Sequence, residues 1–102
     1  MRYLAPSPIY WEHDMTIVLA RSLAGHDKDE VYVIIGEEGD ILLLANGKNR
    51  TLDHPKKKKR KHLQPIRSLP KAVLDLAEDS LSDIKIKEIL KTYHISLESK
   101  EN

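Results

Sequence analysis

The sequence lacks several residue types, and each absence removes a class of protein. None of its 102 residues is cysteine, which excludes a disulfide framework, a thiolate nucleophile and a cysteine-based zinc site. Phenylalanine is absent and there is one tryptophan, so we expect a core of aliphatic side chains. Only four glycines are present, and they form no glycine-rich loop of the kind that cradles phosphates.

Long apolar runs are also missing. No run approaches the roughly 18 residues that a membrane-spanning helix needs, and residues 1–14 lack the apolar stretch of a signal peptide. We therefore expect a cytoplasmic protein that does not enter a membrane. With 40% hydrophobic and 32% charged residues, the composition is typical of one globular domain, which we expect to be a monomer when free.

Charge is distributed unevenly along the chain. The formal net charge is only +1, yet residues 48–67 contain nine lysines or arginines and a single aspartate. Six of these cations are consecutive, from Lys56 to Lys61. Neighbouring ammonium groups repel one another until an anion neutralises them, so the partner of this segment should be anionic.

The first two thirds of the chain have the pattern of a small β domain. Short apolar runs bounded by turn residues predict five strands, at residues 15–22, 31–36, 41–45, 49–53 and 62–66. Asn46 and Gly47 predict a tight hairpin reversal, because both residues accept positive φ. Short strands with a turn every few residues predict a closed or nearly closed β-barrel.

The pattern changes to helical spacing after Arg67. We predict one helix over residues 69–79 with Pro70 near its start, and a second over residues 82–95 with Ser82 as N-cap. The apolar face of the second helix either packs on the barrel or docks a protein partner; it comprises Ile86, Ile89, Leu90 and Tyr93. Residues 96–102 are expected to fray.

The chain thus divides into three parts. Residues 1–14 form an extended N-terminal segment, whose Trp11 either covers the core or docks on a partner. Residues 15–67 form the barrel with its basic block, and residues 68–102 form a helical appendage. The predicted fold is mainly β, a barrel of about five strands with one or two C-terminal helices.

The stretch "SLAGHDKDEVYVIIGEEGDILLLANGKNRTLDHPKKKKRKHLQ", residues 22–64, resembles the bacterial KOW-domain RNA-binding proteins related to a large-subunit ribosomal protein group. The resemblance covers a little under half of the chain. It rests on Gly25 with Asp27-Lys28, on residues 46–50 and on residues 55–63. Where the family usually has glycine after the Asp-Lys pair, this chain has Asp29, which tolerates positive φ better than most residues. The resemblance implies an SH3-like barrel that binds structured, ribosomal RNA.

The basic block is the predicted binding site. We expect an electrostatic clamp on RNA phosphates. With five phosphate contacts, raising the salt concentration from 50 to 200 mM should lower the affinity about 500-fold. With five aromatics in the chain and none in the block, recognition should fall on backbone and shape, and not on stacked bases. The predicted RNA-binding residues are Lys48, Arg50, Lys56, Lys57, Lys58, Lys59, Arg60, Lys61, His62 and Arg67, with His26 and Lys28 as further loop contacts.

Other interpretations of the block remain open. It can be a solvated loop, or a nuclear import signal, since "PKKKKRK" has that composition. The protein can also be an interaction adaptor in translation, with ribosomal proteins as partners, whose basic block only assists binding. The five histidines are scattered without a metal-binding spacing. We therefore expect no enzyme activity, no metal and no cofactor.

Overall fold

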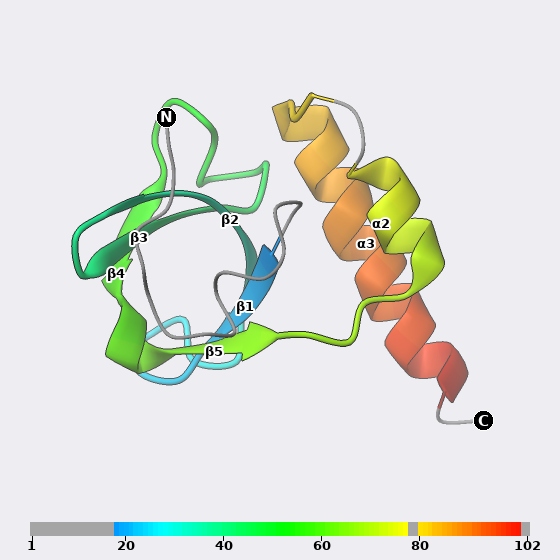
Figure 1. Ribbon diagram of the computed structural model, residues 1–102, viewed down its shortest axis with the longest axis horizontal. Coiled ribbons are helices and arrows are strands. Elements are labelled where there is room, and N and C mark those ends of the chain that lie inside the picture. The colour runs from blue at the N-terminus through cyan, green and yellow to red at the C-terminus, as the bar shows by residue number, and fades with distance from the viewer. Residues whose placement is uncertain (1–17, 78–79, 101–102) are drawn as a thin grey trace.

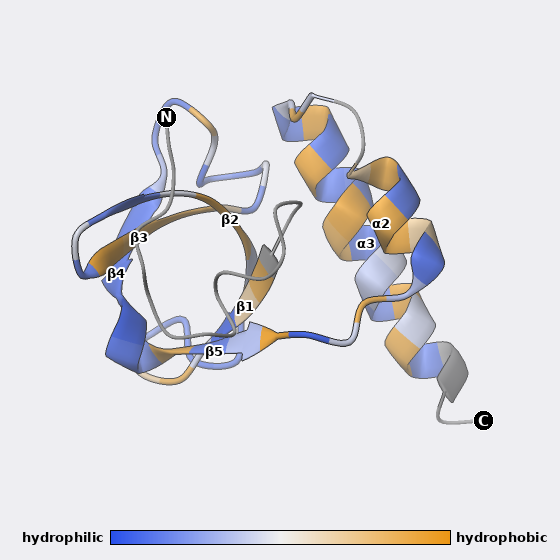
Figure 2. Ribbon diagram, viewed as in Figure 1, coloured by the Kyte–Doolittle hydropathy of each residue, from blue (hydrophilic) through white to orange (hydrophobic). Residues whose placement is uncertain are grey.

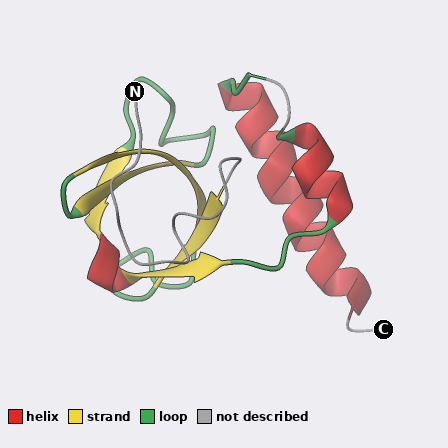
Figure 3. Cartoon of the chain, viewed as in Figure 1, coloured by secondary structure: helices red, strands yellow, loops and turns green. Residues whose placement is uncertain are grey.

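The computed structural model describes residues 18–77 and 80–100. Its β part is one antiparallel sheet, with the strands in the order β4-β3-β2-β1-β5. The strands are β1 (Val18–Ser22), β2 (Val31–Glu38), β3 (Ile41–Ala45), β4 (Lys56–Lys59) and β5 (Leu63–Ile66). The sheet curls strongly, and a short 3-10 helix, η1 (Arg60–His62), joins its two edge strands (Figures 1 and 3).

Two helices lie side by side against the outside of this curl (Figure 1). They are α2 (Lys71–Leu76) and α3 (Asp83–Lys100). The prediction of a mainly β fold with C-terminal helices is confirmed at this level. Neither helix, within the residues described, is both long and apolar enough to cross a membrane.

Hydrophobic side chains cover both faces of the sheet. Neighbouring residues of β1 and β2 alternate between two clusters, so that Leu19 and Val33 belong to one and Ala20 and Tyr32 to the other. The first cluster lies between the sheet and the helices, and the second fills the inside of the curl. Because both faces are buried, β3 and the first five residues of β2 are continuous apolar runs without alternation.

The helical face predicted from the sequence packs on the sheet. Its four residues are buried in the first cluster, namely Ile86, Ile89, Leu90 and Tyr93. Burying one such side chain stabilises a fold by about 1.5 to 3 kcal/mol. The alternative that this face docks a partner is thereby excluded, and α3 is part of the domain's core.

Local signals at the helix start are confirmed. The Ser82 hydroxyl accepts a hydrogen bond from the Lys85 backbone N–H at 3.1 Å, as an N-cap does. The expectation that residues 96–102 fray is wrong for the part described, because α3 continues to Lys100. Its last turns carry no proline or glycine to stop it. The expected N-terminal segment, residues 1–14, lies outside the described residues.

The predicted fourth strand at residues 49–53 is wrong. These residues belong to a loop, and the fourth strand is the lysine run itself, Lys56–Lys59. Gly47 has φ of 80°, but Asn46 does not have positive φ, so the two do not form a two-residue hairpin turn. Instead the Asn46 carboxamide oxygen accepts hydrogen bonds from the backbone N–H groups of Lys48 and Arg50, which closes a wider turn.

That loop is fastened to the start of α3. The Leu52 backbone N–H donates to the Asp83 carboxylate at 2.9 Å. A Cβ on Gly47 would lie 2.5 Å from the Asp83 carbonyl oxygen and 2.7 Å from Cγ of Lys87. Glycine is therefore needed at position 47 for its left-handed backbone and for the close approach of the helix.

Replacing Gly47 by alanine should lower the free energy of unfolding by about 2 to 5 kcal/mol. About 1 to 2 kcal/mol comes from the left-handed conformation and about 1 to 3 from overpacking against α3. Gly39→Ala is the matched control, because Gly39 also has positive φ but nothing lies within 4 Å of its added Cβ. Urea unfolding of both variants measures the difference. Equal losses would show that the helix contact contributes nothing.

Candidate nucleic-acid interface

The lysine run is an edge strand whose side chains alternate between two faces. In the β3–β4 register, Lys56 lies opposite Leu44 and Lys58 opposite Leu42. Directly opposed residues of antiparallel strands point to the same face, and Leu42 and Leu44 belong to the cluster inside the curl. Lys56 and Lys58 therefore point inward, whereas Lys57 and Lys59 point outward. Figure 2 shows β4 and η1 as uniformly hydrophilic, so hydropathy alone conceals this division.

Asp27 receives the two inward lysines. Its carboxylate accepts a hydrogen bond from the Lys58 ammonium at 3.0 Å, and Lys56 lies 3.8 Å from its other oxygen. The hydroxyls of Ser22 and Tyr32 donate to the same carboxylate at 2.9 and 2.8 Å. The side chains of Asp27 and Lys58 are only 13% and 12% exposed. This is a largely buried ion pair inside a hydrogen-bonded network.

The turn between β1 and β2 places Asp27 in that position. Asp29 has φ of 75°, a left-handed conformation that aspartate tolerates better than most residues. The Ser22 carbonyl accepts a hydrogen bond from the Asp29 N–H at 2.8 Å, which closes the turn. The Ala24 carbonyl accepts a second hydrogen bond from Lys58. The turn thus presents both a carboxylate and a carbonyl to one ammonium group.

The network determines the protonation state of Asp27. Burial alone would raise the pKa of this carboxyl, but hydrogen bonds from Tyr32, Lys58 and Ser22 and the charge of Lys58 outweigh that effect. The pKa of Asp27 is consequently held well below its usual value. Burial and the adjacent Asp27 carboxylate raise the pKa of Tyr32. Asp27 is therefore ionised and Tyr32 neutral across the physiological range.

Arg60 forms a second inward pair at the other end of the block. Its guanidinium donates to the Glu37 carboxylate at 2.6 Å, with side-chain exposures of 14% and 12%. The Arg60 backbone N–H also donates to the carbonyl of Asp40 in the β2–β3 turn. Together with the Asp27 network, this pair fastens β4 and η1 to the turns on either side.

The remaining cations of the block face solvent. Lys57 makes an exposed ion pair with Glu38 at 3.5 Å, in which the side chains are 60% and 58% exposed. Lys59 and Lys61 are exposed, and no acidic side chain of the described residues pairs with them. Three of the six consecutive cations are thus directed outward on a fixed backbone.

The other predicted site residues are more widely distributed. Lys48 is exposed and Arg50 half-buried on the β3–β4 loop, while His62 is half-buried in η1. His26 and Lys28 are exposed on the β1–β2 turn. Arg67 follows β5, at the opposite end of that strand from η1. The structure therefore brings most of the predicted set to the β4 region but leaves Arg67 apart from it.

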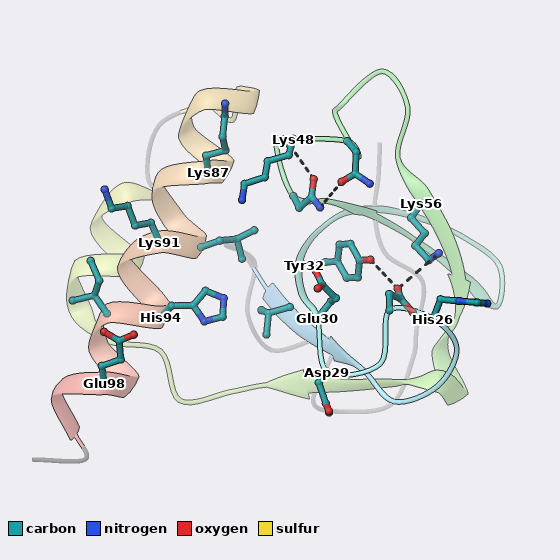
Figure 4. A pocket seen from close by; sticks show the side chains of 16 residues that line it. His26, Asp29, Glu30, Tyr32, Lys48, Lys56, Lys87, Lys91, His94 and Glu98 are labelled. Atoms are coloured by element: carbon teal, nitrogen blue, oxygen red, sulfur yellow. Dashed lines mark hydrogen bonds and ion pairs between the residues drawn. The ribbon is translucent and has the colours of Figure 1, made fainter.

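A groove lies between α3 and the two loops at residues 23–30 and 46–55. It encloses about 960 Å³, and its lining combines Tyr32, Lys48 and Lys56 with one stripe of α3 (Figure 4). The stripe consists of Lys87, Leu90, Lys91, His94, Ile95 and Glu98. None of these is among the predicted RNA-binding residues. Their spacing of three and four residues indicates a common helix face, but the partner of that face is visible only in the tertiary structure.

Across residues 18–77 and 80–100, no group of three or more His, Asp or Glu side chains could hold a metal ion.

No protein-family model matches the chain, and no curated protein does either. The resemblance to KOW-domain proteins therefore stays a prediction.

Proposed function

We propose that the protein binds folded RNA, ribosomal RNA in particular, through the outward face of β4 and η1. In this proposal the curled sheet is an SH3-like barrel of the KOW type, and the contacts are made to phosphates without catalysis. Lys57, Lys59 and Lys61 carry the binding. Lys48, Arg50 and His62 assist from neighbouring positions.

The observation that supports this proposal best is the rigid presentation of lysines that lack buried partners. The inward cations hold the backbone of this segment in place through Asp27 and Glu37. Of the outward lysines, Lys57 has the exposed Glu38 as a partner, and Lys59 and Lys61 have no acidic partner among the described residues. Alternate residues of a strand are about 6.8 Å apart, which is comparable with the spacing of successive phosphates along a nucleic-acid strand. Binding to phosphates releases counterions and relieves the repulsion between these lysines.

The alternatives for the run fit the geometry less well. An import signal acts as an accessible extended peptide, whereas β4 is paired with β3 and three of its four lysines form ion pairs with carboxylates. Lysines on an edge strand also discourage edge-to-edge aggregation. A single charge serves that purpose, so protection of the edge does not account for a run of six.

Salt dependence tests the proposal directly. If only the three outward lysines contact phosphates, the slope of log K against log salt concentration should be about −2.7, which weakens binding about 40-fold between 50 and 200 mM salt. Fluorescence titration of a labelled hairpin RNA over this range measures the slope. Absence of binding at 50 mM salt, or a slope near zero, would contradict RNA binding through this face.

A second candidate function is a protein-interaction adaptor in translation. It is favoured by apolar side chains on α3 that the core does not use, since Ile84 is 71% and Ile95 51% exposed. An adaptor would keep its main protein partner after the outward lysines are replaced. The RNA-binding proposal requires RNA association to be lost while the fold stays intact.

A further inference from the structure

The groove beside α3 has one cationic end. Lys48 extends from the β3–β4 loop toward α3, and Lys87 and Lys91 lie on successive turns of the helix, with the side chain of Lys91 directed away from the loop in the view of Figure 4. Lys87 is close to this loop, because its Cγ would lie 2.7 Å from a Cβ added to Gly47. Lys56 lines the opposite wall and connects the groove to the basic strand.

These lysines face solvent. Lys48, Lys87 and Lys91 are exposed, and none of their ammonium groups has an acidic partner among the residues that the structure describes. Lys87 and Lys91 are four residues apart on one helix face, an arrangement that is unfavourable for like charges. Lys48 adds a third positive charge to the lining of the groove. An anion in the groove would relieve the repulsion.

The polar groups in the lining restrict where such an anion can lie. Asn49 lines the same end as Lys48, and its carbonyl oxygen accepts a hydrogen bond from the Asn46 amide. This leaves the amide group of Asn49 available as a donor. Glu98, eleven residues beyond Lys87, lies at the other end with Asp29 (Figure 4), about 16 Å along the helix. An anion is therefore favoured only at the end near the loop.

We infer that this end of the groove is a second phosphate-binding site, in which Lys48, Lys87 and Lys91 hold the ribose-phosphate backbone of the RNA that crosses β4. The inference rests on the proposed function and extends it to α3. Lys56, whose side chain points inward from β4 to Asp27, lines the groove between the two surfaces. The RNA then contacts the domain on β4 and on the helix, with about six phosphates bound instead of three.

Single and double neutral substitutions on α3 test the site. At 100 mM salt each lost phosphate contact should weaken binding about 8-fold, taking the electrostatic contribution as zero at 1 M salt. Lys87→Gln and Lys91→Gln should therefore each lower affinity for a hairpin RNA about 8-fold, and the double variant about 60-fold. In the double variant, the slope of log K against log salt concentration should change from about −5.4 to about −3.6.

Lys71→Gln is the matched control, because Lys71 is an exposed lysine on α2, away from the groove. It should change the affinity less than 2-fold. Circular dichroism and the urea midpoint should be unaltered in all variants, since glutamine keeps the helix propensity and the side-chain stem. As an independent measurement, bound RNA should protect Lys87 and Lys91, but not Lys71, from acetylation.

The outcomes separate this inference from the proposed function. If the α3 variants bind RNA as the wild type does while substitutions on β4 abolish binding, the groove site is wrong and the β4 interface stands. Absence of acetylation protection at Lys87 and Lys91 would also overturn the groove site. The groove would then suit an acidic peptide better. If the α3 variants lose RNA and the β4 variants do not, the groove alone is the interface.

Discussion

Replacing Asp27 by alanine is expected to lower the free energy of unfolding by about 3 to 5 kcal/mol, a cost typical of leaving one member of a buried ion pair without its partner. The change leaves the Lys58 ammonium largely buried beside the Ala24 carbonyl alone. It also removes the acceptor for Ser22 and Tyr32. Domains of this kind have a total stability of about 5 to 15 kcal/mol, so much of it should be lost. Urea unfolding followed by circular dichroism measures the change.

Glu38→Ala is the matched control for this prediction. It removes the exposed pair with Lys57 and should cost less than about 1 kcal/mol. Adding Lys58→Met to Asp27→Ala should restore part of the loss, because no buried charge is then left unpaired. If the double variant is less stable than Asp27→Ala by the full cost of Lys58→Met alone, the two residues are not coupled.

The pH dependence provides a second measurement of the same network. The pKa of Asp27 is lowered in the folded state, so the unfolded chain takes up a proton first as the pH falls. The stabilisation by Asp27 is therefore fully present above about pH 5 and declines below about pH 4 towards the lower folded pKa. The stability difference between the wild type and Asp27→Asn should shrink over that range. A difference that is independent of pH would mean that the carboxylate charge is unimportant.

Replacing the three outward lysines should remove most RNA binding without unfolding the protein. Neutralising Lys57, Lys59 and Lys61 with glutamine eliminates three phosphate contacts, which corresponds to about 500-fold in affinity at 100 mM salt. Substitution by glutamate should be more severe, because each position then repels phosphate. Exposed substitutions of this kind change stability by about 0.5 kcal/mol or less each. Titration with hairpin RNA, together with the urea midpoint, separates binding from folding.

The choice of positions determines whether this experiment can be interpreted. Glutamate at position 58 or 60 would set a second carboxylate beside Asp27 or Glu37, and the fold would fail along with any binding. Lys59→Gln should weaken binding about 8-fold, whereas Lys71→Gln removes the same charge from α2 without an effect. Retention of RNA by the folded outward triple variant would refute the β4 interface. Aggregation of that variant with normal binding would instead assign these lysines to edge protection.

The tertiary structure divides a basic run that is uniform in sequence. "KKKKRK" has no periodicity of hydrophobicity, and lysine is depleted in strands, so residues 49–53 were the better local candidate for the fourth strand. β4 forms at residues 56–59 because Lys56 and Lys58 meet Asp27 from a turn about 30 residues earlier. Pairing over such a distance leaves no local signal.

The role of Asp27 likewise cannot be predicted from its neighbours in the sequence. Its position after His26 in a polar turn gives no indication that it accepts hydrogen bonds from Ser22, Tyr32 and Lys58. The stripe on α3 is similar, since its helical spacing is visible in the sequence but its proximity to Lys48 is not. In both cases the function of a residue depends on a segment that approaches it only after folding.

Local sequence patterns are sufficient to predict the composition of the core, most of the strands, both helices with the Ser82 cap, and the concentration of positive charge in one segment. These follow from local propensity and from periodicity, which act over a few residues. Three features depend on tertiary packing: which cations pair with Asp27 and Glu37, which cations remain exposed, and the position of α3 beside a groove. An ammonium group pairs with a carboxylate that lies close to it in space, and the distance between the two groups is set by the packing of the whole chain.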